Sequence, residues 1–382
     1  MGIARPVAEA RRTAVLARVA SERMNLLRVT AASPLLTPLD SRQVYFGSVR
    51  GVMDYCSAIS VRADWADSED VQRKAARSML IVASVSKDWS LPDVALSGDL
   101  GLMDVGASFE KAALRLVCRI KSVDKSSQLW RVFDHNRQSC AAAGDPAGNW
   151  CCWVRICLAR VGRADAFDGE WGGGVAPHVL VDRRHQRLWR ERVSGSQVLQ
   201  PLFSSLKRRI EFSEYMREGT ACSRRAILRL RMDQVPTAVT MLRRARPRIP
   251  RAQLLCSNCS LSEQEDTEHL LMRCPLYSAE RVRMFAAVRE TMSSEVLGWA
   301  GAPDIFPKRW VALVLDGELD GVPYAEAFGR ERRAIQRFRA FRTHRRAYLE
   351  VLRRRASLRA AVREPLVSIV ARRSKQSGYL KV

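Results

Sequence analysis

The sequence predicts a mostly α-helical protein that carries one small metal-binding module. Apolar residues recur at helical spacing among Arg and Glu over long stretches of the chain. Pro or acidic residues stand where several of these stretches begin, as is typical of helix N-termini. Three Cys and one His gather between residues 256 and 274, a pattern that indicates a metal site. Together these observations predict a helical domain, a Cys/His module and a basic helical tail.

The first part, residues 1–125, is predicted to be an all-α domain of five helices. Each stretch carries apolar residues on one face, and most begin with a cap, a proline or acidic residues. Gly98 and Gly101 separate the fourth helix from the fifth. The helices are expected over 6–29, from Thr37, from Asp67, from Leu91 and around Phe109.

Residues 126–200 form a variable linker region in which the apolar stretch 150–157 is a buried helix or strand. His135, Cys140, Cys152 and Cys157 could make a second metal site, but Cys in an apolar run more often packs as a small hydrophobe. The run Trp171-Gly172-Gly173-Gly174 lacks the Gly-Lys-Ser/Thr of a phosphate loop and is expected to be a flexible link.

The third part, residues 201–290, contains the strongest motif, Cys256-x2-Cys259-x9-His269-x4-Cys274. Three thiolates and one imidazole match the tetrahedral ligand set that structural Zn²⁺ prefers, so Zn²⁺ is the expected cofactor. The competing interpretation is that these are ordinary buried thiols that fall into this order by chance.

Arginines gather on both sides of this motif and are the candidate contacts to nucleic acid, because guanidinium groups neutralise phosphates and release counterions. The prolines at 247 and 250 prevent a continuous helix there and favour an extended, nucleic-acid-facing strand. The alternative is a solvated helix face on which Arg stems cover the core. The candidates are Arg229, Arg231, Arg243, Arg244, Arg246, Arg248, Arg251 and Arg281.

The tail, residues 291–382, is predicted to contain a basic amphipathic helix, with 17 Lys and Arg against three Glu from Arg330 onward. Such a helix could follow nucleic acid, act as a nuclear localisation signal, or bind an acidic partner or a membrane surface. Pro365 is expected to end it, and the residues after Pro365 are expected to be frayed.

Composition narrows the class of partner. The 382-residue chain has 64 Lys and Arg against 40 Asp and Glu, a formal net charge of +24, which attracts polyanions and makes RNA or DNA the expected partner. No apolar run approaches the roughly 20 residues that cross a bilayer, so no membrane partner is expected. The N-terminal stretch lacks the apolar core of a secretory signal. We therefore expect a nuclear or cytoplasmic protein whose ten Cys stay reduced.

Three short motifs in the helical domain and the Cys/His motif itself carry a family resemblance. In order, the chain resembles the region after the catalytic palm, and then the C-terminal zinc-binding domain, of reverse transcriptases from non-LTR (LINE-type) retrotransposons. The resemblance covers roughly residues 20–120 and 185–290. Its residues are Tyr45, Val49, Met53-Asp54-Tyr55, Val71-Gln72-Arg73, Arg77 and Leu100-Gly101-Leu102, then Arg229-Leu230-Arg231, Cys256, Cys259, Glu265-Asp266, His269-Leu270-Leu271, Cys274-Pro275-x-Tyr277 and Arg281.

The resemblance implies a thumb-like helical domain that grips template and primer, and a zinc module that binds element RNA or target DNA. The family holds two Mg²⁺ with a Tyr/Phe-x-Asp-Asp hairpin and an earlier Asp, and this sequence contains no Asp-Asp pair. We therefore expect no catalytic residues and no polymerase activity from the chain alone. It looks like a C-terminal piece that would work with upstream reverse-transcriptase domains. The nine-residue spacer, and the lack of a Gly soon after Cys259, depart from the family pattern.

Three other interpretations stay open. A host-encoded zinc regulator would bind one duplex sequence much more tightly than others. A zinc-stabilised protein-interaction scaffold would bind nucleic acid weakly or without salt dependence. A decayed retroelement remnant would have no selected activity.

Overall fold

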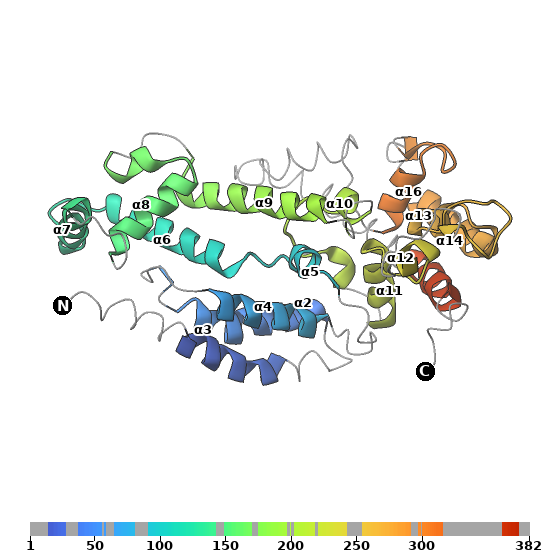
Figure 1. Ribbon diagram of the computed structural model, residues 1–382, viewed down its shortest axis with the longest axis horizontal. Helices are drawn as coiled ribbons and strands as arrows, with labels where there is room; N and C mark the ends of the chain where they lie inside the picture. The colour runs from blue at the N-terminus through green and yellow to red at the C-terminus, as the bar shows by residue number, and fades with distance from the viewer. Residues whose placement is uncertain are drawn as a thin grey trace. The chain divides into compact units, whose positions relative to one another are not determined.

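The computed structural model describes residues 14–27, 37–55, 57–58, 65–80, 91–142, 149–169, 175–196, 199, 202–217, 221–242, 254–291, 297–298, 300–315 and 361–373. These residues are mostly helical (Figure 1), and within them the only β-type pairings are two isolated bridges. The prediction of a mostly α-helical protein is therefore confirmed. Residues 330–360 of the predicted tail helix and the Gly172–Gly174 link lie outside the described residues.

The chain divides into two compact units, each of which is described by itself. The first comprises residues 1–84, 96–192 and 209–212, and the second comprises residues 85–95, 193–208 and 213–382. The predicted boundaries at residues 125, 200 and 290 stay a prediction.

The first unit consists mainly of helices that follow the predicted order. A helix at residues 14–27 lies within the stretch expected over 6–29. The others are α2 (Pro38–Val44), a π-helical turn at Tyr45–Arg50, α3 (Gly51–Met53), α4 (Ala66–Met79), α6 (Val105–Lys121), α7 (Gln128–Ala142), α8 (Trp150–Arg160), a 3₁₀ turn at Ala164–Phe167 and most of α9 (Pro177–Gly195), while α5 (Asp93–Asp99) crosses the boundary between the units.

The start of α2 shows how local chemistry fixes these helices. Thr37 Oγ1 accepts a hydrogen bond from the Asp40 backbone N–H at 3.3 Å, and the Asp40 carboxylate accepts one from the Thr37 N–H at 2.7 Å. This reciprocal capping box satisfies backbone donors that the first turn leaves unpaired. Pro38 occupies the first helical position, where its missing N–H costs nothing.

Residues of the first resemblance form a buried hydrogen-bond network. The Tyr45 hydroxyl donates to Gln72 Oε1 at 3.0 Å, and the Arg50 guanidinium donates to the same oxygen. Arg50 Nε also donates to Asp54 at 2.8 Å, and Gln72 Nε2 donates to the Met103 carbonyl at 3.1 Å. Burial raises the pKa of Tyr45 to about 12, so the hydroxyl stays a donor. The network ties the π-helical turn to α4 and to the loop before α6.

Helices α6, α7 and α8 enclose a core of the first unit, and the apolar stretch 150–157 is a helix buried in it. Cys140 on α7 and Cys152 on α8 form a disulfide. The expectation that all ten Cys are reduced is wrong for this pair, because packing of the two helices brings the sulfurs within bonding distance. Lys121, at the end of α6, donates to the carbonyls of Ala166 and Phe167 and closes this core.

The second unit contains shorter helices around the Cys/His motif. They are α10 (Phe203–Leu206), a 3₁₀ turn at Glu214–Met216, α11 (Ala221–Arg231), α12 (Ala238–Leu242), α13 (Thr267–Met272), a 3₁₀ turn at Pro275–Tyr277, α14 (Ser278–Thr291), α16 (Pro307–Val314) and a helix at residues 361–373.

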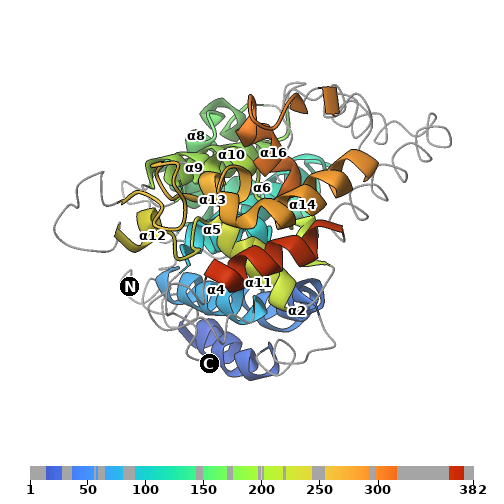
Figure 2. The ribbon, with the colours of Figure 1, turned by 90° about the vertical axis from the view of Figure 1, so that its right-hand side faces the viewer.

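The helix at residues 361–373 corrects one prediction about the tail. Figure 2 shows it in red as a regular helix. The helix continues past Pro365. Val362, Leu366 and Ile369 are buried at helical spacing. Their burial offsets the helix-breaking tendency of proline, so the residues from 366 to 373 are not frayed.

Candidate metal centre

A loop between residues 254 and 265 positions the first two candidate ligands. It folds back on itself through a backbone bridge between Leu255 and Gln264. The Cys256 N–H donates to the Glu263 carbonyl at 2.9 Å, and the return is completed at Ser262, whose φ of 51° lies in the left-handed region. These contacts fix the loop that carries Cys256 and Cys259.

Helix α13 positions the other two candidate ligands. Asp266 caps the helix, and its carboxylate accepts a hydrogen bond from the His269 N–H at 2.8 Å. After α13 ends, the Cys274 N–H donates to the His269 carbonyl, also at 2.8 Å. This hydrogen bond turns the chain back, so Cys274 lies on the same side as the His269 imidazole.

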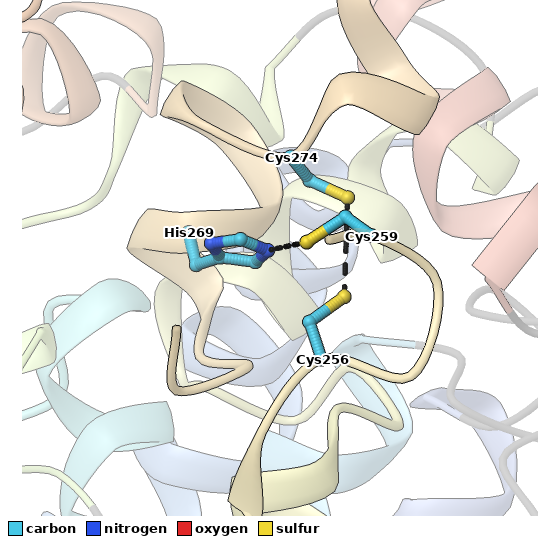
Figure 3. Close-up of side chains that lie close together, drawn as sticks. All are labelled: Cys256, Cys259, His269 and Cys274. Atoms are coloured by element: carbon cyan, nitrogen blue, oxygen red, sulfur yellow. Dashed lines mark hydrogen bonds between the residues drawn. The ribbon is translucent and has the colours of Figure 1, made fainter. Parts of the chain in front are cut away.

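The four side chains converge, as Figure 3 shows. One ligand atom from each of Cys256, Cys259, His269 and Cys274 lies within 4.8 Å of the others. Cys256 Sγ lies 4.0 Å from Cys274 Sγ, and Cys259 Sγ lies 3.5 Å from His269 Nε2. The structure therefore brings together the four residues that the sequence singled out, in an arrangement that could hold a metal ion.

The site is shielded from solvent on most sides. His269 and Cys274 are buried, Cys256 is 6% exposed and Cys259 is half-buried. Burial raises the pKa of the Cys256 thiol to about 12, and it also raises the pKa of Cys274. Without a metal these thiols hold their protons, so metal binding must release them.

Glu263 orients the imidazole. Its carboxylate lies 2.9 Å from His269 Nδ1, which leaves Nε2 directed at the Cys259 sulfur. Arg273 lies 3.3 Å from the same carboxylate and balances its charge. A carboxylate on the second nitrogen of a ligating His is a common support for metal sites. Glu263 was not among the residues predicted from the sequence, although an acidic residue in the spacer was the available signal.

Glu265 is a buried hub beside the first cysteine. One carboxylate oxygen accepts hydrogen bonds from the Ala238 N–H and the Arg373 guanidinium, each at 2.6 Å. The other accepts from the Cys256 thiol at 3.7 Å and from the Asn258 amide at 3.3 Å. Glu265 appeared in the resemblance, but nothing in the sequence indicated its partner 108 residues downstream.

Arg281 supports the last cysteine. Its guanidinium donates to the Cys274 carbonyl at 3.0 Å, and burial lowers its pKa. Tyr277, between them, is buried. Arg281 therefore donates at least one hydrogen bond inside the protein, although it was predicted from the sequence to contact nucleic acid.

Arg231 corrects another candidate contact to nucleic acid. Its side chain is only 1% exposed and donates to the Leu315 carbonyl. The guanidinium lies 5.1 Å from the centre of the Tyr215 ring and 6.0 Å from that of Phe203. Packing between aromatic rings in the core leaves this cation inaccessible to phosphate.

Of the remaining candidate arginines, the structure describes only Arg229. Arg229 is half-buried on α11. The others, Arg243, Arg244, Arg246, Arg248 and Arg251, lie outside the described residues.

The alternative second metal site is not formed. Cys140 and Cys152 are joined to each other, which removes two of its four ligands. Over the part of the chain that the structure describes, the cluster at 256–274 is the one group of Cys, His or acidic residues arranged to hold a metal ion. None of the described helices is both long enough and apolar enough to cross a membrane.

Comparison with known proteins adds no relative: no family model, curated protein or solved structure matches this chain. The site is therefore interpreted from its own geometry.

Proposed function

We propose that the chain is a zinc-dependent nucleic-acid-binding protein that corresponds to the C-terminal portion of a non-LTR retrotransposon reverse transcriptase without its catalytic palm. The observation that carries the proposal is the convergence of three thiols and one imidazole in a strongly basic chain.

Zinc fits the donor set and its spacing. Zn²⁺ binds thiolate sulfur at about 2.3 Å and imidazole nitrogen at about 2.0 Å. A tetrahedral ion therefore separates two of its sulfurs by about 3.8 Å, close to the 4.0 Å between Cys256 and Cys274. Hard cations such as Mg²⁺ and Ca²⁺ prefer oxygen ligands, so the chemistry favours Zn²⁺ among common divalent ions.

Nucleic acid fits the charge of the chain. A formal net charge of +24 gives a long-range attraction for phosphate backbones. Within the module, half-buried Glu263 contacts His269 and Arg273, and buried Glu265 contacts Arg373. These contacts offset part of the negative charge of the two carboxylates, so the carboxylates repel a polyanion less.

The family assignment rests on the resemblance. It gives the protein the role of holding RNA or DNA beside a polymerase domain, and it makes upstream reverse-transcriptase domains the natural partners. The missing Asp-Asp pair supports a binding role and not polymerisation by this chain alone. A nuclear or cytoplasmic location follows from the same role.

The test uses the purified full chain. Zinc content would be measured by elemental analysis, and fluorescence anisotropy would follow binding to single-stranded RNA and duplex DNA over a salt series. We expect about one zinc per chain and binding that weakens with salt and on chelation. Cys259→Ser should lower both zinc content and affinity, whereas Ser257→Ala, in the same turn, should leave both unchanged. Equal affinity for the metal-free Cys259→Ser protein would contradict the proposal.

A protein-interaction scaffold is the second candidate, and the buried position of Arg231 and the half-buried position of Arg281 favour it. Two arginines expected at nucleic acid instead hold the fold together. One zinc per chain together with no nucleic-acid binding at low salt would identify this alternative.

A further inference from the structure

Helices α6 and α9 of the first unit lie side by side and antiparallel (Figure 1). Lys111 on α6 contacts Asp182 on α9 at 2.6 Å. Further along α6, Cys118 lies 4.0 Å from His178, which precedes Asp182 on α9. A residue late in α6 thus contacts a residue early in α9, as expected for antiparallel helices. The Lys111–Asp182 contact marks one edge of their interface.

Helix α6 carries a row of cations that starts at this edge. Arg115 and Arg119 follow Lys111 at intervals of four residues, and both are exposed. Four residues advance a helix by about 6 Å and rotate it by about 40°, so the row runs along one side of α6 for about 12 Å.

Helix α9 carries a matching row. Arg183, Arg187 and Arg190 are all exposed. Counted from Asp182, Arg183 and Arg190 are rotated by about 100° and 80° away from the interface. Because the helices are antiparallel, the same sense of rotation leads both rows to the same side of the pair. The two rows therefore form one surface, which we call the α6–α9 face.

Little negative charge compensates this face. Asp182 is engaged by Lys111, and Glu191 lies 3.9 Å from Arg187 in an exposed pair that contributes little. Among the described residues, Arg115 and Arg183 have no carboxylate within ion-pairing distance.

The pKa of His178 responds to this charge. It is lowered by partial burial and then by the positive charges of Arg115 and Lys111. Positive charge at the edge of the face thus contributes, after burial, to the lowered pKa of this imidazole.

The side chains of the face indicate what kind of partner it fits. Arginine presents a planar fork that binds phosphate oxygens in pairs, and five of the six cations are arginine. Two rows about 10 to 12 Å long suit a chain of phosphates better than a single one. No large apolar side chain on α6 or α9 is among the exposed ones, whereas a membrane-binding helix would present such residues.

We propose that the α6–α9 face is a second nucleic-acid docking surface, which binds the phosphate backbone independently of the metal centre. The proposal takes its class of partner from the proposed function but places the contact in the other compact unit.

The test compares two fourfold variants of the full chain by anisotropy with single-stranded RNA. Both remove four exposed positive charges from the first unit, and their melting temperatures would be checked against the parent. The face variant is Arg115→Gln, Arg119→Gln, Arg183→Gln and Arg190→Gln. The control is Arg18→Gln, Arg73→Gln, Arg131→Gln and Arg155→Gln, on other helices.

The face variant should bind at least about tenfold more weakly than the control, and the slope of log affinity against log salt should fall by about three, since each lost contact removes about 0.7. Equal losses in the two variants would show that only net charge matters and would overturn the proposal. If the face variant lost as much affinity for polyglutamate as for RNA, the assignment of the face to nucleic acid would be overturned.

Cys259→Ser separates this inference from the proposed function. RNA binding that survives Cys259→Ser but is lost in the face variant would support the α6–α9 face and refute metal dependence. Binding that is lost in Cys259→Ser and unchanged in the face variant would do the opposite.

Discussion

Arg373, near the end of the described chain, contacts Glu265 beside the candidate metal centre at 2.6 Å, and both side chains are buried. The same Glu265 carboxylate accepts a hydrogen bond from the Cys256 thiol at 3.7 Å. The helix at residues 361–373 is thus connected to a candidate metal ligand through one residue. Removing either partner leaves a buried charge without compensation.

Arg373→Met should therefore destabilise the second unit by about 3 kcal/mol and weaken zinc binding about tenfold or more. Zinc affinity would be measured by competition with a chelator, and stability by denaturant unfolding. Arg283→Met is the control, since Arg283 makes only a long contact of 3.7 Å with exposed Glu364. The double variant Arg373→Met/Glu265→Gln should recover part of the loss. No effect of Arg373→Met on zinc affinity would refute the connection.

Glu263→Gln should lower zinc affinity about 10- to 100-fold, because the neutral amide supports the His269 imidazole less strongly. Glu268→Gln is a closely matched control. Both acids contact Arg273, but only Glu263 reaches the imidazole. Equal zinc affinities for the two variants, again from chelator competition, would argue against this role of Glu263.

Stability should change with pH in opposite directions with and without zinc. In protein from which a chelator has removed the metal, burial raises the pKa of Cys256 to about 12, above the ordinary thiol value of about 8.5. The resulting stabilisation is complete below pH of about 8.5 and is lost as pH rises toward 12. With zinc bound, protons compete for the thiolates, so stability falls as pH decreases. Denaturant midpoints at several pH values would reveal the two slopes, and parallel slopes would count against zinc ligation by this thiol.

Gln72→Ala should destabilise the first unit by about 2 to 4 kcal/mol, because the buried Tyr45 hydroxyl and Arg50 Nη1 both lose the acceptor that they share. Gln138→Ala, which removes an exposed contact to Asp134 on α7, should cost under about 0.5 kcal/mol. Zinc content should stay unchanged in both. Denaturant unfolding would measure the difference, and equal costs would show that the network contributes little.

The local parts of the fold could be predicted from the sequence because their determinants are close together in the chain. The two residues of the capping box, Thr37 and Asp40, are only three positions apart. The four residues of the Cys/His cluster likewise lie within residues 256–274. The roles of arginines could not be predicted in this way. Arg231 and Arg373 look like surface cations in the sequence, and only tertiary packing against Leu315 and Glu265 reveals them as buried.

The predictions that all Cys are reduced and that the tail helix ends at Pro365 failed for the same reason. Cys140 and Cys152 become partners when α7 packs on α8. Pro365 predicts a helix end from its own chemistry, but burial of Leu366 and Ile369 outweighs that local preference. In each case long-range contacts decide what short-range patterns leave open.

Zinc-edge X-ray absorption spectroscopy of the purified full chain would show whether Cys256, Cys259, His269 and Cys274 bind zinc. We expect about one zinc per chain with three sulfur ligands near 2.3 Å and one nitrogen ligand near 2.0 Å, and one sulfur fewer in Cys259→Ser. A zinc-free protein, or a zinc shell of oxygen and nitrogen alone, would contradict this expectation.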